Sequence, residues 1–479
     1  MADMNPTPPY SASRYEHLRE QHRATLWIPW TLILLGIWMM LAPVTFGHLN
    51  PALWVEPSGG RGVWFSDGTH TALRASLMTW SDVLSGVLLV GLGWRRLRPD
   101  RPISGWLACG VGAWLNAAPL LFWAPTSAAY LNDTLVGMWV IALTILIPRM
   151  PNMTLFMRMG GARPPGWTYN PSSWPQRWIM IATGFLGYLA SRALAMYQLG
   201  YAPGIWDPFF GEGSRRVLDS AMSHSLPISD AGLGTLAYTF EFLMGFMGGV
   251  SRWRTMPWMV ALFGVLVIPL GLVHIVLVIS QPLVVGAWCT LCLAAAAIML
   301  PMIPLEVDEV VAMLQHVTRA RDRGEGTWSV FWKGGDPSAA EEDEGGIELV
   351  ELPERPGVVL RASVRGFSAP VPLLLTALGG LALMVLPGLQ GVGGTAADVF
   401  HLGGALLLVV AVIAMAEVLR SARMLAVLLG GSVAVAAWVV DAPLGFALVG
   451  TLIAVTAAGA ALPRGPVLDR YGTWDRFIR

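Results

Sequence analysis

The chain has 479 residues, of which 54% are hydrophobic and only 13% charged, whereas about 25% of the residues of an ordinary soluble protein are charged. Its 31 Lys and Arg residues balance its 31 Asp and Glu residues, so the charge gives no reason to expect a nucleic-acid partner. No polar segment is long enough to build a large soluble enzyme domain, and the composition predicts an all-α polytopic integral membrane protein surrounded by membrane lipid.

Apolar segments long enough to cross a bilayer recur along the chain. We expect twelve spanning helices, near residues 25–45, 79–95, 104–124, 129–149, 176–199, 231–250, 257–280, 282–303, 370–389, 398–418, 422–440 and 443–463. They form three groups of four. The predicted parts are an N-terminal segment (1–24), a first module (25–150), a central four-helix bundle (175–315), a linker (316–368), a second module (369–463) and a tail (464–479).

Basic residues cluster on alternate loops of this twelve-helix arrangement. Examples are Arg14 and Arg19 before the first helix, Arg95 and Arg96 after the second, and Arg420 between the tenth and eleventh. Because Lys and Arg are retained on the cytoplasmic side, this alternation predicts that both termini, the linker and the tail are cytoplasmic. The first apolar run is too long for a cleavable signal peptide, so we expect it to remain as a spanning helix.

The two outer modules share an internal repeat. Its first copy places a small residue, Gly36, two positions before Trp38 and seven before Pro43, and the next helix carries Leu84 and Gly86 as Leu-x-Gly. The other copies contain Gly112 and Gly137, Gly380 and Gly404, and Ala436 and Gly450. Small residues at fixed positions let neighbouring helices approach closely. The helix pairs resemble the SPW-repeat family of bacterial membrane modules.

Only three cysteines are present, which excludes a disulfide scaffold and a zinc site made of four cysteines. We expect no metal. Cys109 lies in the apolar run WLACGVGAWL and is expected to pack as an inert side chain. Cys289 and Cys292 lie in QPLVVGAWCTLCLAAAAIML, where Pro282 is suited to the first turn of a helix. This position of Pro282 predicts that Cys289 lies in the second turn and Cys292 one turn further.

At this spacing the two sulfur atoms share one helix face and can form and break a disulfide. The predicted topology places Cys289 and Cys292 toward the extracytoplasmic side, where thiol oxidation is normal. Two readings remain open, a redox pair and two buried inert thiols.

The signature WCTLC at residues 288–292, preceded by a long apolar helix, is similar to the vitamin K epoxide reductase family. The resemblance covers residues 175–315 and implies a four-helix membrane bundle in which a Cys-x-x-Cys pair reduces a quinone. It implies that Cys292 reacts with a membrane quinone of the menaquinone or ubiquinone type. Cys289 would exchange with an extracytoplasmic thiol. In bacterial members electrons pass from substrate thiols to the quinone, which implies a location in the bacterial cytoplasmic membrane.

The same resemblance implies where the quinone binds. Residues 225–245 resemble the second helix of the family, with Asp230 at the position of an amide that bonds the quinone and Tyr238 at an aromatic position. Together with Trp288, these residues are the expected quinone contacts.

Two features depart from the family pattern. The loop GIWDPFFGEGSRRVLDSAMSHSLP contains no second cysteine pair, and position 296 is Ala where animal members have a quinone-binding tyrosine. Either an extracytoplasmic thioredoxin-like protein or a small thiol reaches Cys289 directly, or the catalytic cycle has been lost. The alternative function is therefore a non-catalytic scaffold or an accessory subunit of a larger membrane complex. A transporter built from repeats would need charged groups in the outer modules, whose helices are nearly free of them.

Other residues carry two readings each. His274 and His401 lie in apolar helices and could ligate a haem, or simply form hydrogen bonds. Trp206, Phe209 and Phe210 could cap a quinone pocket, or anchor the outer loop in an interfacial aromatic belt.

Overall fold

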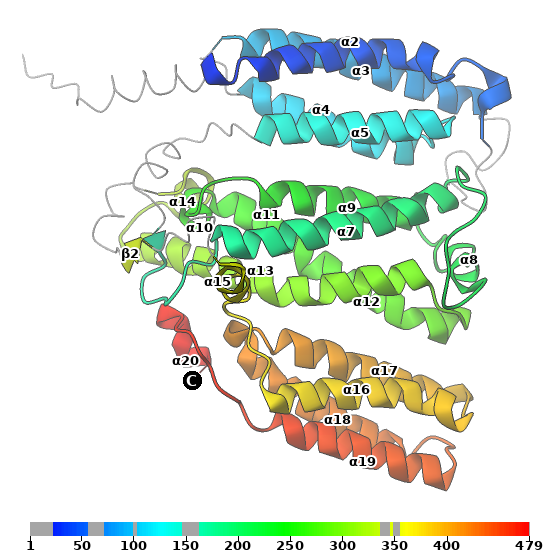
Figure 1. Ribbon diagram of the computed structural model, residues 1–479, viewed down its shortest axis with the longest axis vertical. Coiled ribbons are helices and arrows are strands. Elements are labelled where there is room, and N and C mark those ends of the chain that lie inside the picture. Colours follow the sequence, from blue (N-terminus) through cyan, green and yellow to red (C-terminus); the bar gives the residue numbers. More distant parts are fainter. Residues whose placement is uncertain are drawn as a thin grey trace, which may run out of the picture. The chain divides into compact units, whose positions relative to one another are not determined.

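The computed structural model describes residues 23–55, 71–98, 103–145, 162–335, 345–347 and 355–478. Arg14, Arg19 and nearly all of the predicted N-terminal segment lie outside these residues. The described chain is helical apart from two short antiparallel strands, β1 (Ala162–Arg163) and β2 (Gly345–Ile347) (Figure 1). The all-α prediction is confirmed.

Ten segments of the described chain are long and apolar enough to cross a membrane. They are α2 (Trp27–Thr45), α3 (Thr71–Arg96), α5 (Ser127–Ile145), α7 (Trp174–Gln198), α11 to η3 (Pro257–Val285), α13 (Thr290–Asp322), α16 (Val371–Gln390), α17 (Gly394–Ile413), η5 with α18 (Glu417–Ala436) and α19 (Leu444–Ala461). The remaining two predicted segments are also helical, as α4 (Ile103–Leu121) and α9 (Asp230–Gly245), but α9 has only 16 residues and α4 is less apolar. The chain is a multi-pass membrane protein.

Shorter elements connect these helices. They are η1 (Pro51–Leu53), α8 (Gly213–Leu218), α10 (Arg252–Thr255), α14 (Thr327–Lys333), α15 (Pro356–Ser363), η6 (Gly472–Trp474) and α20 (Asp475–Ile478). Two of the spanning segments are themselves composed of shorter elements. One consists of α11 (Pro257–Val267), α12 (Pro269–Ser280) and η3 (Gln281–Val285), and the other of η5 (Glu417–Ala422) and α18 (Arg423–Ala436). The chain divides into two compact units. The first comprises residues 1–154, 191–206 and 218–247, and the second comprises residues 155–190, 207–217 and 248–479.

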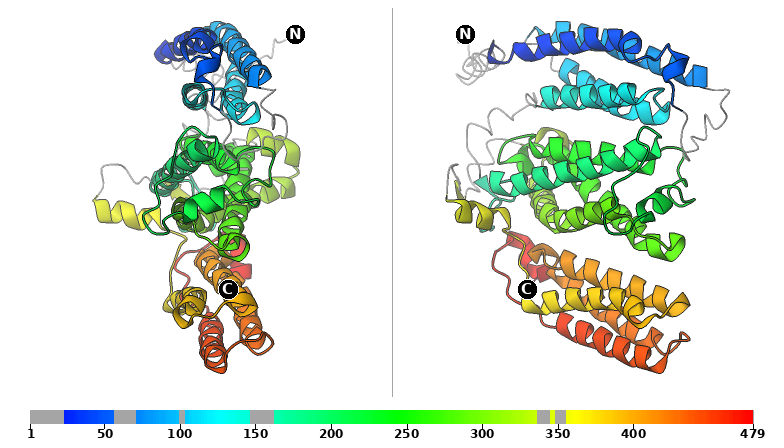
Figure 2. Two further views of the ribbon diagram at one scale, coloured as in Figure 1. Left: turned by 90° about the vertical axis from the view of Figure 1, so that its right-hand side faces the viewer. Right: turned by 45° about the vertical axis from the view of Figure 1, so that its right-hand side comes forward.

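In the first unit, α2 and α3 form a hairpin and α4 and α5 form another (Figures 1 and 2). A Cβ atom on Gly36 would lie 2.6 Å from the carbonyl oxygen of Gly86, and a Cβ atom on Gly137 would lie 2.6 Å from that of Gly112. Any larger residue would therefore push the paired helices apart. These are the small residues of the repeat, so the close approach expected from the sequence is confirmed in both hairpins.

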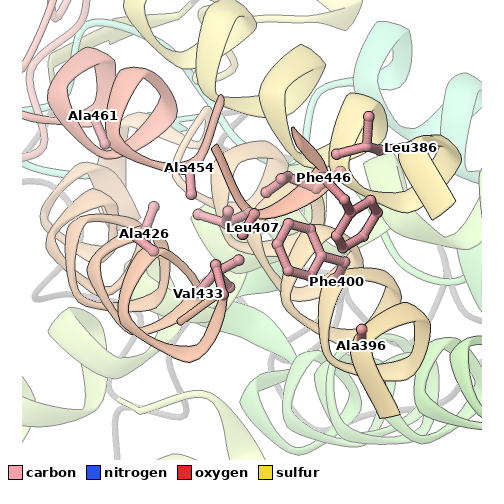
Figure 3. Packing of buried hydrophobic residues seen from close by; sticks show 13 residues of the cluster. Leu386, Ala396, Phe400, Leu407, Ala426, Val433, Phe446, Ala454 and Ala461 are labelled. Carbon is pink, nitrogen blue, oxygen red and sulfur yellow. The ribbon is translucent and has the colours of Figure 1, made fainter. Parts of the chain in front are cut away.

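In the second unit, α16 to α19 form a four-helix bundle with a core of alanine, leucine, valine and phenylalanine side chains (Figure 3). Gly380 and Gly404 reproduce the glycine contact of the other hairpins, because a Cβ atom on Gly380 would lie 2.6 Å from the Gly404 carbonyl oxygen. The fourth hairpin differs. Gly450 faces the ring of Phe400, which packs on Phe446 with the ring centroids 4.5 Å apart, so here the small residue makes room for an aromatic core.

Helix α13 continues to Asp322, well beyond the predicted end of its apolar part. The stretch EVDEVVAMLQHV at residues 306–317, which spans the predicted boundary between the bundle and the linker, is therefore part of α13. Its acidic residues are buried, and Glu309 accepts two hydrogen bonds from Arg252, at 2.6 Å and 2.5 Å, and a further one from the Ser172 hydroxyl. A fully buried and fully bonded ion pair thus ties α13 to α10 and to the segment preceding α7.

The tail also packs in the second unit. The Tyr471 hydroxyl and the backbone N–H groups of Leu468 and Asp469 donate hydrogen bonds to the Glu417 carboxylate. Tyr471 also forms an edge-on ring contact with Trp167, at a centroid distance of 4.9 Å. The tail is therefore part of the packed structure of this unit.

Candidate redox site

The two neighbouring cysteines lie at the beginning of α13 and form a disulfide, with 5.2 Å between their Cα atoms. Cys289 is the N-cap residue, with φ −112° and ψ 118°, and Cys292 lies in the first turn. The backbone N–H of Cys292 donates to the Cys289 sulfur at 3.2 Å, and the N–H of Cys289 donates to the Gln281 side chain at 3.1 Å. Unpaired N–H groups at a helix start favour negative charge, whereas the full burial of Cys289 opposes it.

The prediction that Pro282 starts this helix, with Cys289 in its second turn, is wrong. Pro282 belongs to η3, a π-helical turn that extends α12. Gly286 then adopts φ +66°, a left-handed conformation that glycine tolerates and that ends the preceding helix. Helix α13 begins only at Thr290. The two sulfur atoms still meet, because an N-cap residue and the residue three positions later face each other.

A loop segment, residues 207–217, covers the beginning of α13. The Thr290 hydroxyl donates a hydrogen bond to the Asp207 carboxylate, and the Thr290 N–H donates to the Ser214 hydroxyl at 3.0 Å. Asp207 also accepts from the backbone N–H groups of Phe210, at 3.0 Å, and Ser214, at 2.7 Å. One carboxylate therefore joins the loop to the residue next to Cys289.

Partial burial would raise the pKa of Asp207, but the hydrogen bonds from Thr290, Ser214 and Phe210 outweigh it and hold the pKa at about 2. Because this value is below that of an unfolded aspartate, near 3.9, the loop contact is fully present above about pH 4. It is lost as the pH falls toward 2.

Replacing Asp207 by Asn is expected to loosen this loop. The amide cannot accept the same set of charge-assisted hydrogen bonds, each worth about 1.5–3 kcal/mol. We expect a small dithiol to reduce Cys289–Cys292 about tenfold faster in Asp207→Asn, as measured by alkylation of the released thiols. Asp441→Asn, in the α18–α19 connection, is the matched control. An unchanged rate would show that the loop does not limit access to the disulfide.

Trp288 lies between the loop and a helix of the second module. Its half-buried ring stacks on Phe210, with centroids 6.4 Å apart, and meets the His401 ring edge-on at 5.2 Å. His401 is buried on α17, and its Nε2 lies 3.2 Å from the carbonyl oxygen of Ile279. The hairpin α16–α17 therefore supports the residue that precedes the cysteine pair, a role not foreseen from the sequence.

The expected quinone contacts fall in different units. Trp288 belongs to the second unit with the cysteines, whereas Asp230 and Tyr238 lie on α9 in the first. Asp230 follows the N-cap residue of α9 and accepts hydrogen bonds from Gln198, at 2.7 Å, and Ser223, at 3.1 Å. Tyr238 is buried. Their role toward a quinone remains a prediction.

The outer-loop aromatic residues are exposed. Trp206 and Phe209 are 68% and 78% exposed, and only Phe210 contacts the site through Trp288. Among the residues that the structure describes, no group of three or more His, Cys, Asp or Glu side chains could hold a metal ion. Cys109 is a half-buried free thiol.

Sequence reasoning missed Gln281, Asp207 and Ser214. Gln281 lies eight residues before Cys289. It precedes Pro282, the residue from which the start of α13 was wrongly predicted. Asp207 and Ser214 approach Thr290 across 83 and 76 residues of chain, so no local pattern connects them. The one available signal was chemical, because Asp207 is an acidic residue among the aromatic side chains of the outer loop.

Comparison with known families agrees with this site. Residues 178–307 match the model of the Vitamin K epoxide reductase family, which confirms the resemblance over the central region. The match covers 130 of the 479 residues and includes both cysteines. No curated protein and no solved structure gives a significant match to the chain. The chain is thus a multi-pass membrane protein with a vitamin K epoxide reductase family domain, which indicates a membrane thiol oxidoreductase.

Proposed function

We propose that this chain oxidises extracytoplasmic thiols through Cys289 and Cys292 and passes the electrons to a membrane quinone. The observation that carries the proposal is a disulfide between an N-cap cysteine and a first-turn cysteine of a membrane-spanning helix, inside the segment that matches the family. A dithiol and a disulfide interconvert by exchange of two electrons and two protons, which is also the exchange between a quinone and a quinol.

In this cycle an external thiolate attacks the sulfur of Cys289 and forms a mixed disulfide, while Cys292 leaves as a thiolate. A second external thiol resolves the mixed disulfide, which leaves Cys289 reduced and the substrate oxidised. The reduced pair then gives two electrons and two protons to the quinone, which becomes a quinol, and the Cys289–Cys292 disulfide re-forms. Each step balances without a metal ion.

The surroundings of the pair suit these steps. Trp288 and Phe210 offer stacked aromatic faces beside the cysteines, which fits a flat apolar quinone ring. On the family resemblance alone, we also propose that Asp230 and Tyr238 contact a quinone. Cys289 is fully buried and Cys292 is 9% exposed. An external thiol must therefore displace residues 207–217 to reach Cys289. The donor is an extracytoplasmic thioredoxin-like protein or a small thiol.

We place the chain in the bacterial cytoplasmic membrane with both termini in the cytoplasm. The alternation of basic loops supports this orientation. It puts the start of α13 on the oxidising side, where a disulfide can persist.

Purified full-length protein in lipid vesicles tests the proposal. A dithiol donor and a short-chain quinone are mixed without oxygen, and quinol formation is followed by absorbance. We expect steady turnover, with one quinol formed for each dithiol oxidised, and an unchanged rate in Cys109→Ser. Equal rates in Cys289→Ser/Cys292→Ser would overturn the proposal and favour a non-catalytic accessory subunit of a larger membrane complex.

A further inference from the structure

Three of the buried ionisable side chains in the N-terminal module lie together, and the redox site does not use them. Asp82 lies in the middle of α3, Asp133 lies in α5, and His48 follows the end of α2. All three are 0% exposed. An ionisable group inside a membrane bundle is costly to keep, so three at one place need a physical explanation.

The three side chains face one another. The Nδ1 atom of His48 lies 3.7 Å from a carboxylate oxygen of Asp82, and the Asp82 and Asp133 carboxyl groups lie within hydrogen-bonding reach of each other. Neither ring nitrogen of His48 has a hydrogen-bond partner among the residues that the structure describes. The same holds for both oxygens of Asp82 and for one of Asp133, whose other oxygen accepts from Asn132 at 3.1 Å. His48 is thus a buried, unbonded polar group directed at the acidic pair.

The charges of His48, Asp82 and Asp133 indicate that the cluster binds a proton. Burial lowers the pKa of His48 to about 4, so the imidazole is neutral at neutral pH and does not balance a carboxylate. Two carboxylates side by side in a dry interior repel each other, and they form a hydrogen bond only when one of them is protonated. One proton shared by the two carboxyl groups removes the repulsion between two negative charges and provides the hydrogen bond between them.

The neighbouring helices bring other charged and titratable groups, and their described contacts are with other residues. Arg74, on α3, donates to the Val55 carbonyl at 2.9 Å. Tyr130, on α5, lies beneath the guanidinium of Arg192, and the Tyr201 hydroxyl donates to the Ala124 carbonyl at 2.6 Å. The ion contact that Asp82 makes is with His48, at 3.7 Å.

Helix α4 adds neutral support. Its Trp114 donates to the Ser81 hydroxyl at 2.9 Å, one residue before Asp82. On α2, Trp38 donates to the Asn132 side chain at 2.7 Å, which fixes the amide that bonds Asp133. Each of the four helices thus holds part of the cluster in place.

We propose that the N-terminal module contains a proton-binding site, in which Asp82 and Asp133 share one exchangeable proton and His48 transfers it between the acidic pair and water. The proton comes from water and returns to water, so the step needs no oxidant or reductant. This function does not depend on the cysteines, so its test is independent of the test of the thiol chemistry.

Infrared difference spectroscopy on the full-length protein in lipid vesicles tests this site. We expect a carbonyl-stretching band of a protonated carboxylic acid that persists at neutral pH and shifts in D₂O. Asp82→Asn and Asp133→Asn should each remove it, whereas Asp322→Asn, at the exposed end of α13, should not. Glu241 is a further buried carboxyl group in the same unit. The band is therefore assigned to Asp82 and Asp133 by its loss in the two aspartate variants.

His48→Gln separates transfer of the proton from its binding, and it remains informative should either aspartate variant fail to fold. We expect the band to persist while its exchange in D₂O slows about tenfold or more, because a positioned base is lost. An absent band at neutral pH, a band unchanged in both aspartate variants, unchanged exchange in His48→Gln, or displacement of the band by Na⁺ at constant pH would each overturn the proposal.

Discussion

Replacing Cys292 by Ser is expected to reduce thiol-dependent quinol formation by about 10³-fold or more, because no disulfide can then form and residues acting as a unit fail together. The same loss is expected for Cys289→Ser. The two variants should differ in what they trap. With a small disulfide as oxidant, Cys292→Ser should accumulate a stable mixed disulfide at Cys289, because the resolving thiol is missing.

Cys289→Ser should accumulate much less of this adduct, because in the proposed cycle the external thiol exchanges with Cys289 and not with Cys292. Intact mass spectrometry measures both adducts, and Cys109→Ser provides the control with full activity. Similar adducts on Cys289 and Cys292 would show that the external thiol does not distinguish them. Retained activity in either single variant would contradict a mechanism that needs the disulfide.

The second large effect concerns the buried ion pair of Arg252 and Glu309. Removing one partner, as in Glu309→Gln or Arg252→Gln, leaves an uncompensated charge in the interior and should lower the free energy of unfolding by about 3–5 kcal/mol. The Glu309 carboxylate accepts the two bonds from Arg252, at 2.5–2.6 Å, and one from the hydroxyl of Ser172, so either replacement breaks charge-assisted hydrogen bonds in the interior.

Denaturant titration in detergent, followed by circular dichroism, measures this effect. Arg323→Gln is the matched control, because its ion pair with Glu325 is partly exposed and should contribute less than about 1 kcal/mol. The double replacement Arg252→Met/Glu309→Leu should recover much of the loss, since neither charge remains buried. A loss in Glu309→Gln no greater than in the control would show that the pair does not hold α13 in place.

The spanning helices could be predicted from the sequence because a bilayer demands long apolar segments with internally paired backbones. The glycine contacts could be predicted for a similar reason. Gly36 and Gly86 occupy repeated positions where only a small residue allows close helices, and the structure places them in contact. The SPW-like assignment of these modules remains a prediction.

Other features depend on interactions that local patterns do not contain. The end of η3 is set by the positive φ of Gly286, and Pro282 is equally acceptable one turn before that end or at the start of a new helix. Helix α13 extends past its apolar part, where Glu309 is paired with Arg252, which lies 57 residues away along the chain. The contact of His401 with Trp288 joins a flanking module to the site, and no spacing rule could connect them.

A single-turnover experiment tests the central claim most directly. The fully reduced protein is mixed with one equivalent of quinone without oxygen, quenched with an alkylating reagent, and analysed by peptide mass spectrometry. We predict that Cys289 and Cys292 lose their labels together as quinol appears, while Cys109 stays labelled throughout. Quinol formation with both cysteines still labelled, or no quinol while the pair remains reduced, would contradict this account.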